Sequence, residues 1–428
     1  MFVFKEKDLG SYDVLVAGGG IAGVCTAISA ARAGVRTVLV EASGSLGGTL
    51  TEGFMPRLID ADNKGGLVRE LHDFLNIHGL TLAHRGARVD AEGRRIPGGM
   101  VDTEGCKVFF DRACEQAGVT VLFHSRVCAV EMDGRRIGRV MLSTEGGNAT
   151  VGATVFVDAT GGGALAELSG CAWACGDPVE GKPSPLSLAL CTVGMPPHLC
   201  GTDSVADKDA YAAMLAEYGI SISAEQASVK RMPSLHTWNM GVNFEYGVQP
   251  DDILALSRAT ARARGELFDF IEAQRRIEGF ADTYTAFTGA HIGVREGRRV
   301  YGEYRLTDED IIEGRRFDDA VCLVTAGVDV HKLHEHDTLD CVRGVHSQPY
   351  HIPYRALVAR DADNLLLSGR CLSGDFYPHA SYRMMGNMAA VGEAAGFAAS
   401  LCIADATLPR EVDGRRVRSF MEQRGYAM

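Results

Sequence analysis

One short stretch near the C-terminal end of the chain gathers side chains that can perform acid–base chemistry. The segment "DFYPHASYR" carries a carboxylic acid, a histidine, an arginine and two tyrosines between Asp375 and Arg383. A histidine can accept the proton of an alcohol, and an arginine can bind a carboxylate through two parallel hydrogen bonds. His379, Tyr382 and Arg383 are therefore candidate catalytic residues. The alternative is that they only hold the loop in place.

Two further segments supply candidate substrate contacts. The stretch "HIGVREGRRVYGEY" contributes Arg295, although its charges suit a structural network of ion pairs at least as well. The stretch "VDVHKLHEHD" contributes His331, which is followed by His334 and His336. Three histidines could ligate a metal, but this spacing lacks the i, i+4 pairing of helical zinc sites. We therefore expect no metal centre.

The elements that would position these residues begin with a glycine-rich turn near the start of the chain. In "VLVAGGGIAG" an apolar strand leads into Gly18, Gly20 and Gly23, and an alanine-rich helix follows over 21–33. In such a turn the first glycine bends the chain, the second lets backbone approach a pyrophosphate, and the third lets the helix pack on the strand. A second strand, "RTVLVE", ends in Glu41, where an acid can bind ribose hydroxyls. This pattern predicts a dinucleotide site.

The identity of the dinucleotide follows from later glycines. A second glycine bend, Gly47-Gly48, comes a few residues after the acid, and a later apolar strand, "GATVFVDATGG", runs into Thr160 and Gly161. Here the chain resembles the flavoproteins with two dinucleotide-binding domains, in which an Ala-Thr-Gly turn closes the FAD site. The resemblance implies that the cofactor is FAD and that these four residues contact it.

The resemblance extends to the C-terminal part of the chain. The segments "GVREGRRVYGEYRLTDEDI" and "NLLLSGRCLSGDFYPHASYRMMGN" are similar to those of the FAD-dependent oxidoreductases often labelled xanthan lyases. More distantly, the chain resembles the flavoproteins of fumarate reductase and succinate dehydrogenase, whose substrate loop H-x-A-N-R-x-x-G-N is echoed by "HASYRMMGN". This resemblance implies that Arg383 occupies the place of a substrate-binding arginine.

The same C-terminal part contains the elements that would reach the flavin ring. An apolar strand over 365–367 turns at a Gly-Arg pair, and an alanine-rich helix begins near Gly386. The free N–H groups and positive dipole end of this helix would stabilise the negative charge of reduced flavin. Four residues of these elements are expected cofactor contacts: Gly369, Arg370, Asn387 and Met388.

These features predict an FAD-dependent oxidoreductase, a dehydrogenase or oxidase that passes hydride between flavin N5 and a small polar organic substrate. One alternative is an ene-reductase of the fumarate-reductase type, which runs in the opposite direction and uses Arg383 as its clamp. Another is an FAD-binding electron-transfer subunit or redox sensor without a substrate of its own. No second G-x-G-x-x-G follows a strand, so an electron donor or acceptor that the sequence does not identify must complete the cycle.

Composition limits the partners and the location. The 428 residues carry a net charge of −12 without a basic stripe to neutralise phosphates, so we expect no nucleic-acid partner. No apolar run approaches the roughly 20 residues of a membrane-spanning helix, and the N-terminus lacks a secretory pattern. The expected location is the cytoplasm, and the sequence is compatible with a homo-oligomer.

The order of the elements predicts an α/β protein. Residues 1–168, with a β-α-β start and a later strand meander, and residues 346–428 would form a discontinuous Rossmann-like FAD-binding domain. Residues 169–345, which mix helical pieces with irregular segments, would form an inserted α+β cap or substrate domain over the flavin ring.

Overall fold

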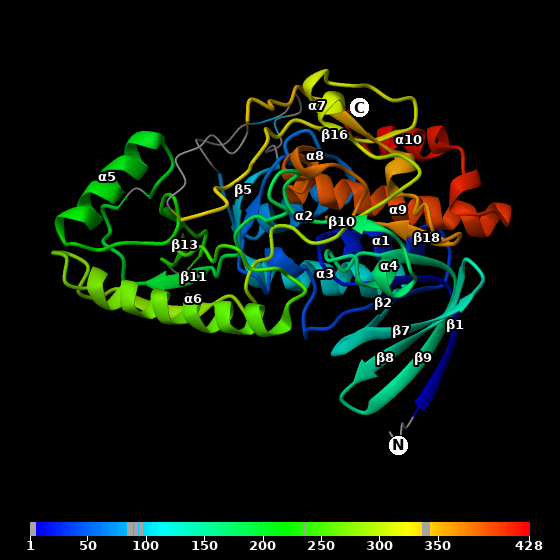
Figure 1. The fold of residues 1–428 in the computed structure, drawn as a ribbon, viewed down its shortest axis with the longest axis horizontal. Coiled ribbons are helices and arrows are strands. Elements are labelled where there is room, and N and C mark those ends of the chain that lie inside the picture. Colours follow the sequence, from blue (N-terminus) through cyan, green and yellow to red (C-terminus); the bar gives the residue numbers. More distant parts are fainter. Residues whose placement is uncertain are drawn as a thin grey trace.

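The structure is a computed structural model that describes residues 6–83, 89, 93, 97–199, 201–234, 236–335 and 343–428. A large α/β body contains the N-terminal strands and the C-terminal helices side by side. An extension built around α5 (Val205–Glu217) and α6 (Ile253–Gln274) projects from one side of this body (Figure 1). We call this extension the cap.

A parallel sheet forms the centre of the body. β1 (Glu6–Ala17) lies between β2 (Thr37–Val40) and β9 (Gly147–Asp158), and β6 (Thr120–Leu122) and β18 (Leu365–Leu367) pair with β2 and β9. All these pairings are parallel, and β2 and β18 are buried along their whole length. Strands buried on both faces are expected of a parallel sheet that lies between helices.

The register of this sheet decides which loops meet. Asp158, the last residue of β9, pairs with Ala17 of β1 on one side and with Leu367 of β18 on the other. The carboxyl ends of parallel strands lie at one edge of a sheet, where ligands of open α/β folds bind. The glycine turn after β1, the Thr160 turn after β9 and the loop after β18 therefore leave the sheet together. The predicted α/β class is confirmed.

An antiparallel ribbon continues from β9. β8 (Arg136–Thr144) pairs with the first half of β9, and β7 (Ser125–Asp133) pairs with β8. These strands form the long ribbon that extends below the body in Figure 1. The predicted meander before the closing strand is thus present.

Helices α1 (Ile21–Arg32) and α9 (Met385–Asp405) cross at a distance that only glycine permits. A Cβ atom added to Gly392 would lie 2.2 Å from the Ala22 carbonyl oxygen, and one added to Gly396 would meet the backbone of α1 at 2.1 Å. Side chains at these two positions would push the helices apart. The crossing ties the C-terminal helix to the helix that follows the glycine turn.

α9 is also the one helix of the described residues that is long and apolar enough, by composition, to cross a bilayer. However, 83% of its apolar stretch is buried inside the protein, against α1 and the sheet. Its apolar character is therefore accounted for by its place in the core.

Shorter elements complete the body. Helices α2 and α3 pack beside α1 and α9. These two helices and the remaining short elements are η1 (Gly48–Leu50), β3 (Arg57–Leu58), α2 (Gly66–Ile77), β4 (Thr81–Leu82), β5 (Gly99–Val101), α3 (Thr103–Ala117), α4 (Ala164–Leu168), β10 (Trp173–Ala174), β15 (Arg299–Val300), α7 (Asp308–Ile312), β16 (Ala320–Val324), β17 (Tyr350–Pro353), η2 (Tyr354–Leu357), α8 (Phe376–Tyr382), η3 (Pro409–Glu411) and α10 (Gly414–Gln423).

The cap has a hydrophobic core of its own. Helices α5 and α6 pack with an antiparallel sheet in the order β12-β13-β11-β14. Its strands are β11 (Leu190–Val193), β12 (Ser228–Arg231), β13 (Trp238–Gly241) and β14 (Tyr284–Thr288). The residues of this core run from Leu186 to Ile292, whereas Val300 and Val324 pack in the core of the body. The segment that contributes to the cap core is therefore shorter than residues 169–345, and the predicted domain boundaries stay a prediction.

The chain returns from the cap to the body along a short strap, residues 289–294. The Ala290 N–H group donates to the Glu52 carbonyl (2.8 Å), and Gly293 pairs with Ser187 in an antiparallel bridge. The strap thus lies between the loop that follows β2 and the cap.

We predict that Gly392→Ala lowers the midpoint of thermal unfolding, because its Cβ would lie 2.2 Å from the Ala22 carbonyl oxygen. Overpacking of this kind costs about 1–3 kcal/mol in the free energy of unfolding. Gly265→Ala on α6 is the matched control, since nothing lies within 4 Å of its added Cβ. Alanine at that control position should stabilise the helix by up to about 1 kcal/mol. Circular dichroism melts would contradict the close crossing if both variants melted alike.

Candidate active site

The three glycines of the turn after β1 have different surroundings. A Cβ added to Gly18, whose φ is +100°, would lie 2.6 Å from the Ala159 carbonyl oxygen, and one added to Gly23 would lie 1.8 Å from the Gly18 carbonyl oxygen. Gly20 has a φ of −63°, and a Cβ added there would meet no described atom within 4 Å beyond its chain neighbours. Gly18 and Gly23 therefore serve packing, whereas Gly20 borders open space.

The second glycine bend and the N-terminus of α1 border the same space. Gly47 pairs with Gly20 in a parallel bridge, and a Cβ added to Gly48 would lie 2.9 Å from the Cα of Gly20. No side chain caps α1, and its first turn contains no acidic residue. The positive end of the helix dipole and its unpaired N–H groups are therefore available for a phosphate.

Glu41 lies beside this turn with both carboxylate oxygens engaged. One oxygen accepts from the N–H group of Gly19 (2.6 Å), and the other accepts from the N–H group of Ser43 (2.7 Å). Each oxygen keeps a second lone pair, which can accept a hydrogen bond from a ribose hydroxyl. The backbone bonds thus orient the acid for the role predicted from its position.

Asp158 organises the turn that follows β9. Its buried carboxylate accepts hydrogen bonds from the N–H group (3.0 Å) and the hydroxyl (2.7 Å) of Thr160 and from the N–H group of Ala166 (2.8 Å). Burial raises the pKa of Asp158, and these hydrogen bonds oppose the shift. The sequence analysis missed this residue, although an acid that ends an apolar strand is a usable signal.

Arg370 is a half-buried cation with no acidic partner in the described part of the chain. Its Nη1 donates to the Val294 carbonyl, and its Nη2 lies only 2.7 Å from where a Cβ on Gly161 would be. Burial and the charge of Arg383 lower the pKa of Arg370 to about 10, so it stays protonated at neutral pH. Gly369, at a φ of +93°, makes the turn that places this side chain.

These features fit FAD. The open space beside Gly20, the free N–H groups of α1 and the unpaired guanidinium of Arg370 would hold the pyrophosphate, and Glu41 would hold the ribose. The turns of Thr160 and Gly161 lie at the same edge of the sheet. The hydrogen-bond donors at this edge, and the open space that a side chain at Gly20 would fill, therefore agree with the FAD that we expect from the sequence.

The start of α9 is more occupied than the sequence suggests. The Asn387 side chain donates to Asp60 (2.8 Å) and accepts from the thiol of Cys322 (3.5 Å), and Met388 is buried. The N–H group of Gly386 donates to the backbone carbonyl just after β3 (3.0 Å). Because these groups already bind protein, contact of Asn387 and Met388 with FAD stays a prediction.

His379 and Tyr382 are buried on α8. The Tyr382 hydroxyl donates to the Leu372 carbonyl (2.9 Å), so its proton is already bound within the protein. The Nε2 atom of His379 is buried and has no hydrogen-bond partner among the described residues. Burial and the charges of Arg299 and Arg383 hold the pKa of His379 well below its ordinary value. His379 is therefore a neutral imidazole at pH 7.

Arg383, just after α8, joins residues that lie far away in the sequence. Its Nη2 donates to the backbone carbonyl of Asp329 (2.7 Å) and to the Asp329 carboxylate (2.9 Å). The other carboxylate oxygen lies 3.8 Å from Nε2 of His331, whose Nδ1 lies 3.8 Å from Glu225. Burial and the charge of Arg295 lower the pKa of His331 to about 3, so this ring is also neutral.

Arg295 approaches the same place from the cap. Its Nη1 donates to the Pro185 carbonyl (2.6 Å), and its guanidinium lies over the ring of Phe244, 4.5 Å from the ring centre. Its charge helps to lower the pKa of Asp329, as the charge of Arg383 does more strongly, although burial opposes both. We call the group the charged cluster; it consists of Glu225, Arg295, Asp329, His331 and Arg383.

The structure thus brings together three residues that were predicted separately, Arg295, His331 and Arg383. The sequence analysis missed Asp329 and Glu225. Asp329 stands two residues before His331, so its nearness to a candidate histidine was a usable signal. Nothing in the sequence points to Glu225, which reaches the cluster only through the fold of the cap.

The histidines after His331 do not assemble a metal centre in the part that can be described. His334 pairs with Glu180 (2.9 Å), and His336 lies outside the described residues. Within the described ranges, no group of three or more histidine, cysteine, aspartate or glutamate side chains is placed to hold a metal ion.

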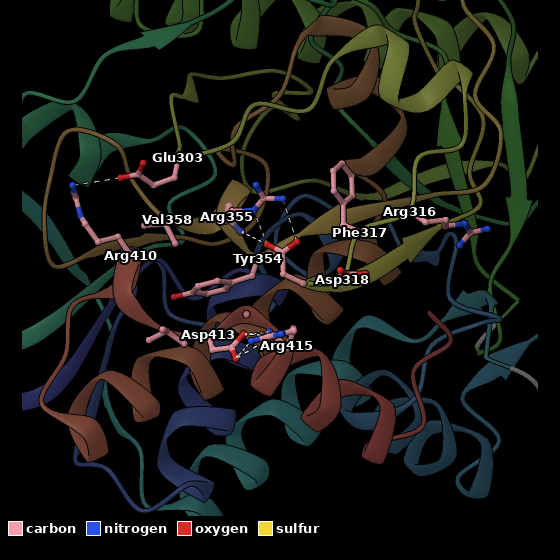
Figure 2. Close-up of a pocket in the computed structure, with 13 residues that line it drawn as sticks. Glu303, Arg316, Phe317, Asp318, Tyr354, Arg355, Val358, Arg410, Asp413 and Arg415 are labelled. Carbon is pink, nitrogen blue, oxygen red and sulfur yellow. Dashed lines mark hydrogen bonds and ion pairs between the residues drawn. The ribbon is translucent and has the colours of Figure 1, made fainter.

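A separate pocket of about 920 Å³ shares no lining residue with the charged cluster (Figure 2). Its lining comes from the loop before β16, from η2 and η3, and from the start of α10, with two residues of neighbouring loops: Glu303, Arg316, Phe317, Asp318, Asp319, Tyr354, Arg355, Val358, Arg410, Val412, Asp413, Gly414 and Arg415. Three of its four arginines already have acidic partners, in the pairs Arg355–Asp319, Arg410–Glu303 and Arg415–Asp413. Most of its charge is thus neutralised within the protein, so the edge of the sheet remains the candidate site.

We predict that Gly20→Val leaves the unfolding midpoint of the FAD-free protein unchanged but weakens FAD binding by roughly 100-fold, about 2.7 kcal/mol. The backbone at Gly20 accepts any residue, and the new side chain would fill the space for the pyrophosphate. Gly23→Val is the contrasting variant, because its Cβ would lie 1.8 Å from the Gly18 carbonyl oxygen and should disrupt folding itself. Titration of apoprotein with FAD, followed by flavin fluorescence, measures the effect. Parental affinity in Gly20→Val would contradict the placement.

Comparison with known proteins identifies the family and the fold. The sequence model of the family described as FAD dependent oxidoreductase matches residues 13–421. A geranylgeranyl bacteriochlorophyll reductase-like protein from Thermoplasma acidophilum has a similar structure (TM-score 0.51, 13% identity, covering 98% of this chain and 84% of that chain). So does p-nitrophenol 4-monooxygenase PnpA from Pseudomonas putida (TM-score 0.51, 12% identity, covering 97% and 87%). At such identities the likeness shows the fold alone.

The family match covers every element of the site, from the glycine turn to the residues after α8. Together with the similar structures it confirms the Rossmann-like FAD-binding fold and the cofactor. This chain is therefore an enzyme of the FAD-dependent oxidoreductase family, and FAD is its cofactor.

Proposed function

We propose that this enzyme transfers hydride between its FAD and a small polar organic substrate that binds at the charged cluster. The contact between Arg383 and Asp329 carries the proposal, because it places the cluster next to α8. α8 follows the loop of Gly369 and Arg370, which borders the FAD site. The side chains of Asp329 and His331 are 49% and 24% exposed, so a substrate can reach the cluster from solvent.

Neighbouring groups suit His379 to accept a proton. Bound FAD supplies the acceptor or donor of hydride at the reacting carbon. A neutral imidazole with an unpartnered, buried Nε2 in the described structure can take the hydroxyl proton of an alcohol. His379 lies four residues before Arg383, so the two side chains share one side of α8 and its C-terminal end.

Other functions of FAD-dependent proteins would use the charged cluster differently. An ene-reductase would use the same residues in the opposite direction, and an electron-transfer subunit or redox sensor would need no substrate cluster. One of the similar structures is named a monooxygenase, which adds oxygen insertion as a further reaction to test. We place dehydrogenation or oxidation first because His379 is neutral and can act as a base. The finer resemblance to the xanthan-lyase-labelled type, the cytoplasmic location and self-association stay predictions.

Anaerobic spectroscopy of the holoenzyme distinguishes these reactions. Bleaching of oxidised flavin by members of an alcohol and hydroxy-acid panel supports the proposed direction. If only enoates respond, by reoxidising chemically reduced enzyme, the ene-reductase replaces it. If neither panel exchanges electrons with the flavin but small electron carriers do, the enzyme is an electron-transfer protein. Substrate-dependent incorporation of oxygen after reduction would point to the monooxygenase reaction.

We predict that His379→Ala slows substrate-driven flavin reduction by roughly 10²–10⁴-fold, the usual loss for a missing acid–base partner. FAD content should stay near the parental value, because His379 is expected to act on substrate. His334→Ala is the control, since His334 is exposed and pairs with Glu180 outside the cluster. Stopped-flow reduction and the flavin-to-protein absorbance ratio are measured on both variants. A His379 variant that loses FAD but keeps its single-turnover rate would show a structural role instead.

The pH dependence follows from the same histidine. A base acts only when it is deprotonated, and burial holds the pKa of His379 well below its ordinary value. We therefore predict that the rate of flavin reduction stays level from about pH 8 down to about pH 6, whereas a base with the usual pKa of about 6.5 would lose more than half of its active form. A rate that falls with an apparent pKa near that usual value would contradict the assignment.

A further inference from the structure

We infer that Arg295 binds an anionic group of the substrate, and that the substrate is a small organic acid that carries a carboxylate. This inference rests on the proposed function, which places the substrate at the charged cluster. It assigns the anion to Arg295 rather than to Arg383, the arginine that the family resemblance favours. The assignment depends on which of the two cations already has a partner.

Arg383 is already neutralised within the protein. Its Nη2 binds both the backbone carbonyl and the carboxylate of Asp329, at 2.7 and 2.9 Å. Because Asp329 already neutralises Arg383, a substrate carboxylate there would either displace Asp329, which is costly for partly buried charges, or bind beside a second negative charge. His331 adds no positive charge, because its ring is neutral. Arg383 therefore orients Asp329 and His331.

Arg295 carries a charge that no acid in the described structure contacts. A guanidinium has five N–H donors, and among the described residues its only hydrogen-bond acceptor is the Pro185 carbonyl. No carboxylate of those residues lies within ion-pair distance, although Asp329 and Glu225 act on it from farther away. Burial and the charge of Arg383 lower the pKa of Arg295 to about 10, so it remains protonated at neutral pH. Charges withdrawn from water are normally paired, so this cation lacks an anion.

The residues on both sides of Arg295 are themselves held in place. The preceding carbonyl, of Val294, is the one that Arg370 of the FAD site binds. The following residue, Glu296, has a carboxylate that pairs with Arg299. This carboxylate also accepts hydrogen bonds from the N–H groups of Gly176 (2.8 Å) and Ser184 (3.2 Å). Arg295 is thus the member of the charged cluster whose neighbour in sequence contacts the FAD site.

The contact with Phe244 specifies the kind of anion. A guanidinium that lies over an aromatic ring has one face covered, so the N–H groups along its edge remain for a ligand. A planar edge with paired donors matches the two oxygens of a carboxylate. Arg370, another arginine with no acidic partner among the described residues, lies against Gly161 at the glycine turns and would serve the FAD phosphates instead. Arg295 therefore remains as the residue that binds the carboxylate of the substrate.

The test measures binding without turnover. Oxidised holoenzyme is titrated with acetate and propionate, which carry no hydroxyl group to oxidise, and with the uncharged analogues acetamide and propionamide, while the flavin absorbance bands are followed. We expect the carboxylates to shift the bands with saturation and the uncharged analogues to have no effect. Arg295→Met should weaken carboxylate binding roughly 10–100-fold, the usual loss of a charged hydrogen-bonded contact. Arg295→Lys should recover part of that loss, because it restores the charge without the paired donors.

Arg262→Met is the matched control, because it removes a cap arginine that already pairs with Glu245 at 2.7 Å. It changes the net charge equally and should leave carboxylate binding at the parental value. FAD content and the unfolding midpoint of each variant show that the fold is intact. Carboxylate binding that is unchanged in Arg295→Met, or equally weakened in Arg262→Met, overturns the inference.

The outcomes also separate this inference from the proposed function. If carboxylates bind through Arg295 but no alcohol or hydroxy acid reduces the flavin, the inference stands and hydride transfer from such substrates fails. If uncharged alcohols reduce the flavin and no carboxylate shifts its bands, the proposed function stands and the inference is overturned.

Discussion

The close crossing of α1 and α9 is the contact on which the site depends. Gly392 and Gly396 let α9 lie directly on the helix that follows the glycine turn. The crossing packs the last long helix of the chain against the first, while the pairing of β18 with β9 brings the loop of Arg370 to the edge of the sheet where Gly20 borders open space. The cofactor contacts at the two ends of the chain are therefore held together by the sheet and by a helix crossing in which there is no room for side chains.

The cofactor site could largely be predicted from the sequence, because each of its parts obeys a local rule. The roles of Gly18, Gly20 and Gly23 follow from the geometry of a turn between a strand and a helix, and the structure separates them as expected. The position of Glu41 follows from the length of one β-α-β unit. Parallel pairing then places the turns after β1, β9 and β18 side by side, so local patterns in distant segments add up to one site.

The charged cluster could be predicted only in part, because its members meet through tertiary contacts alone. Arg383 was found by its resemblance to a substrate loop, but no local pattern links it to its partner Asp329, which lies 54 residues earlier in the segment of His331. The occupied side chain of Asn387 was unexpected for a similar reason: its partners, Asp60 and Cys322, come from separate parts of the body. Composition also does not assign Val300 and Val324 to one core, since they look equally apolar in either, although both pack in the core of the body.

The strap of residues 289–294 has a consequence for how the molecule comes apart. One end is bonded to the Glu52 carbonyl after β2, and the carbonyl at the other end is held by Arg370 after β18. The strap is thereby bonded to two segments of the body, and moving it away would strip Arg370 of its only described acceptor. Cap and body should therefore lose their structure in a single cooperative step. A chimera that carries the cap of a relative would therefore have to keep residues 289–294 of this chain. The foreign cap would be joined before residue 289.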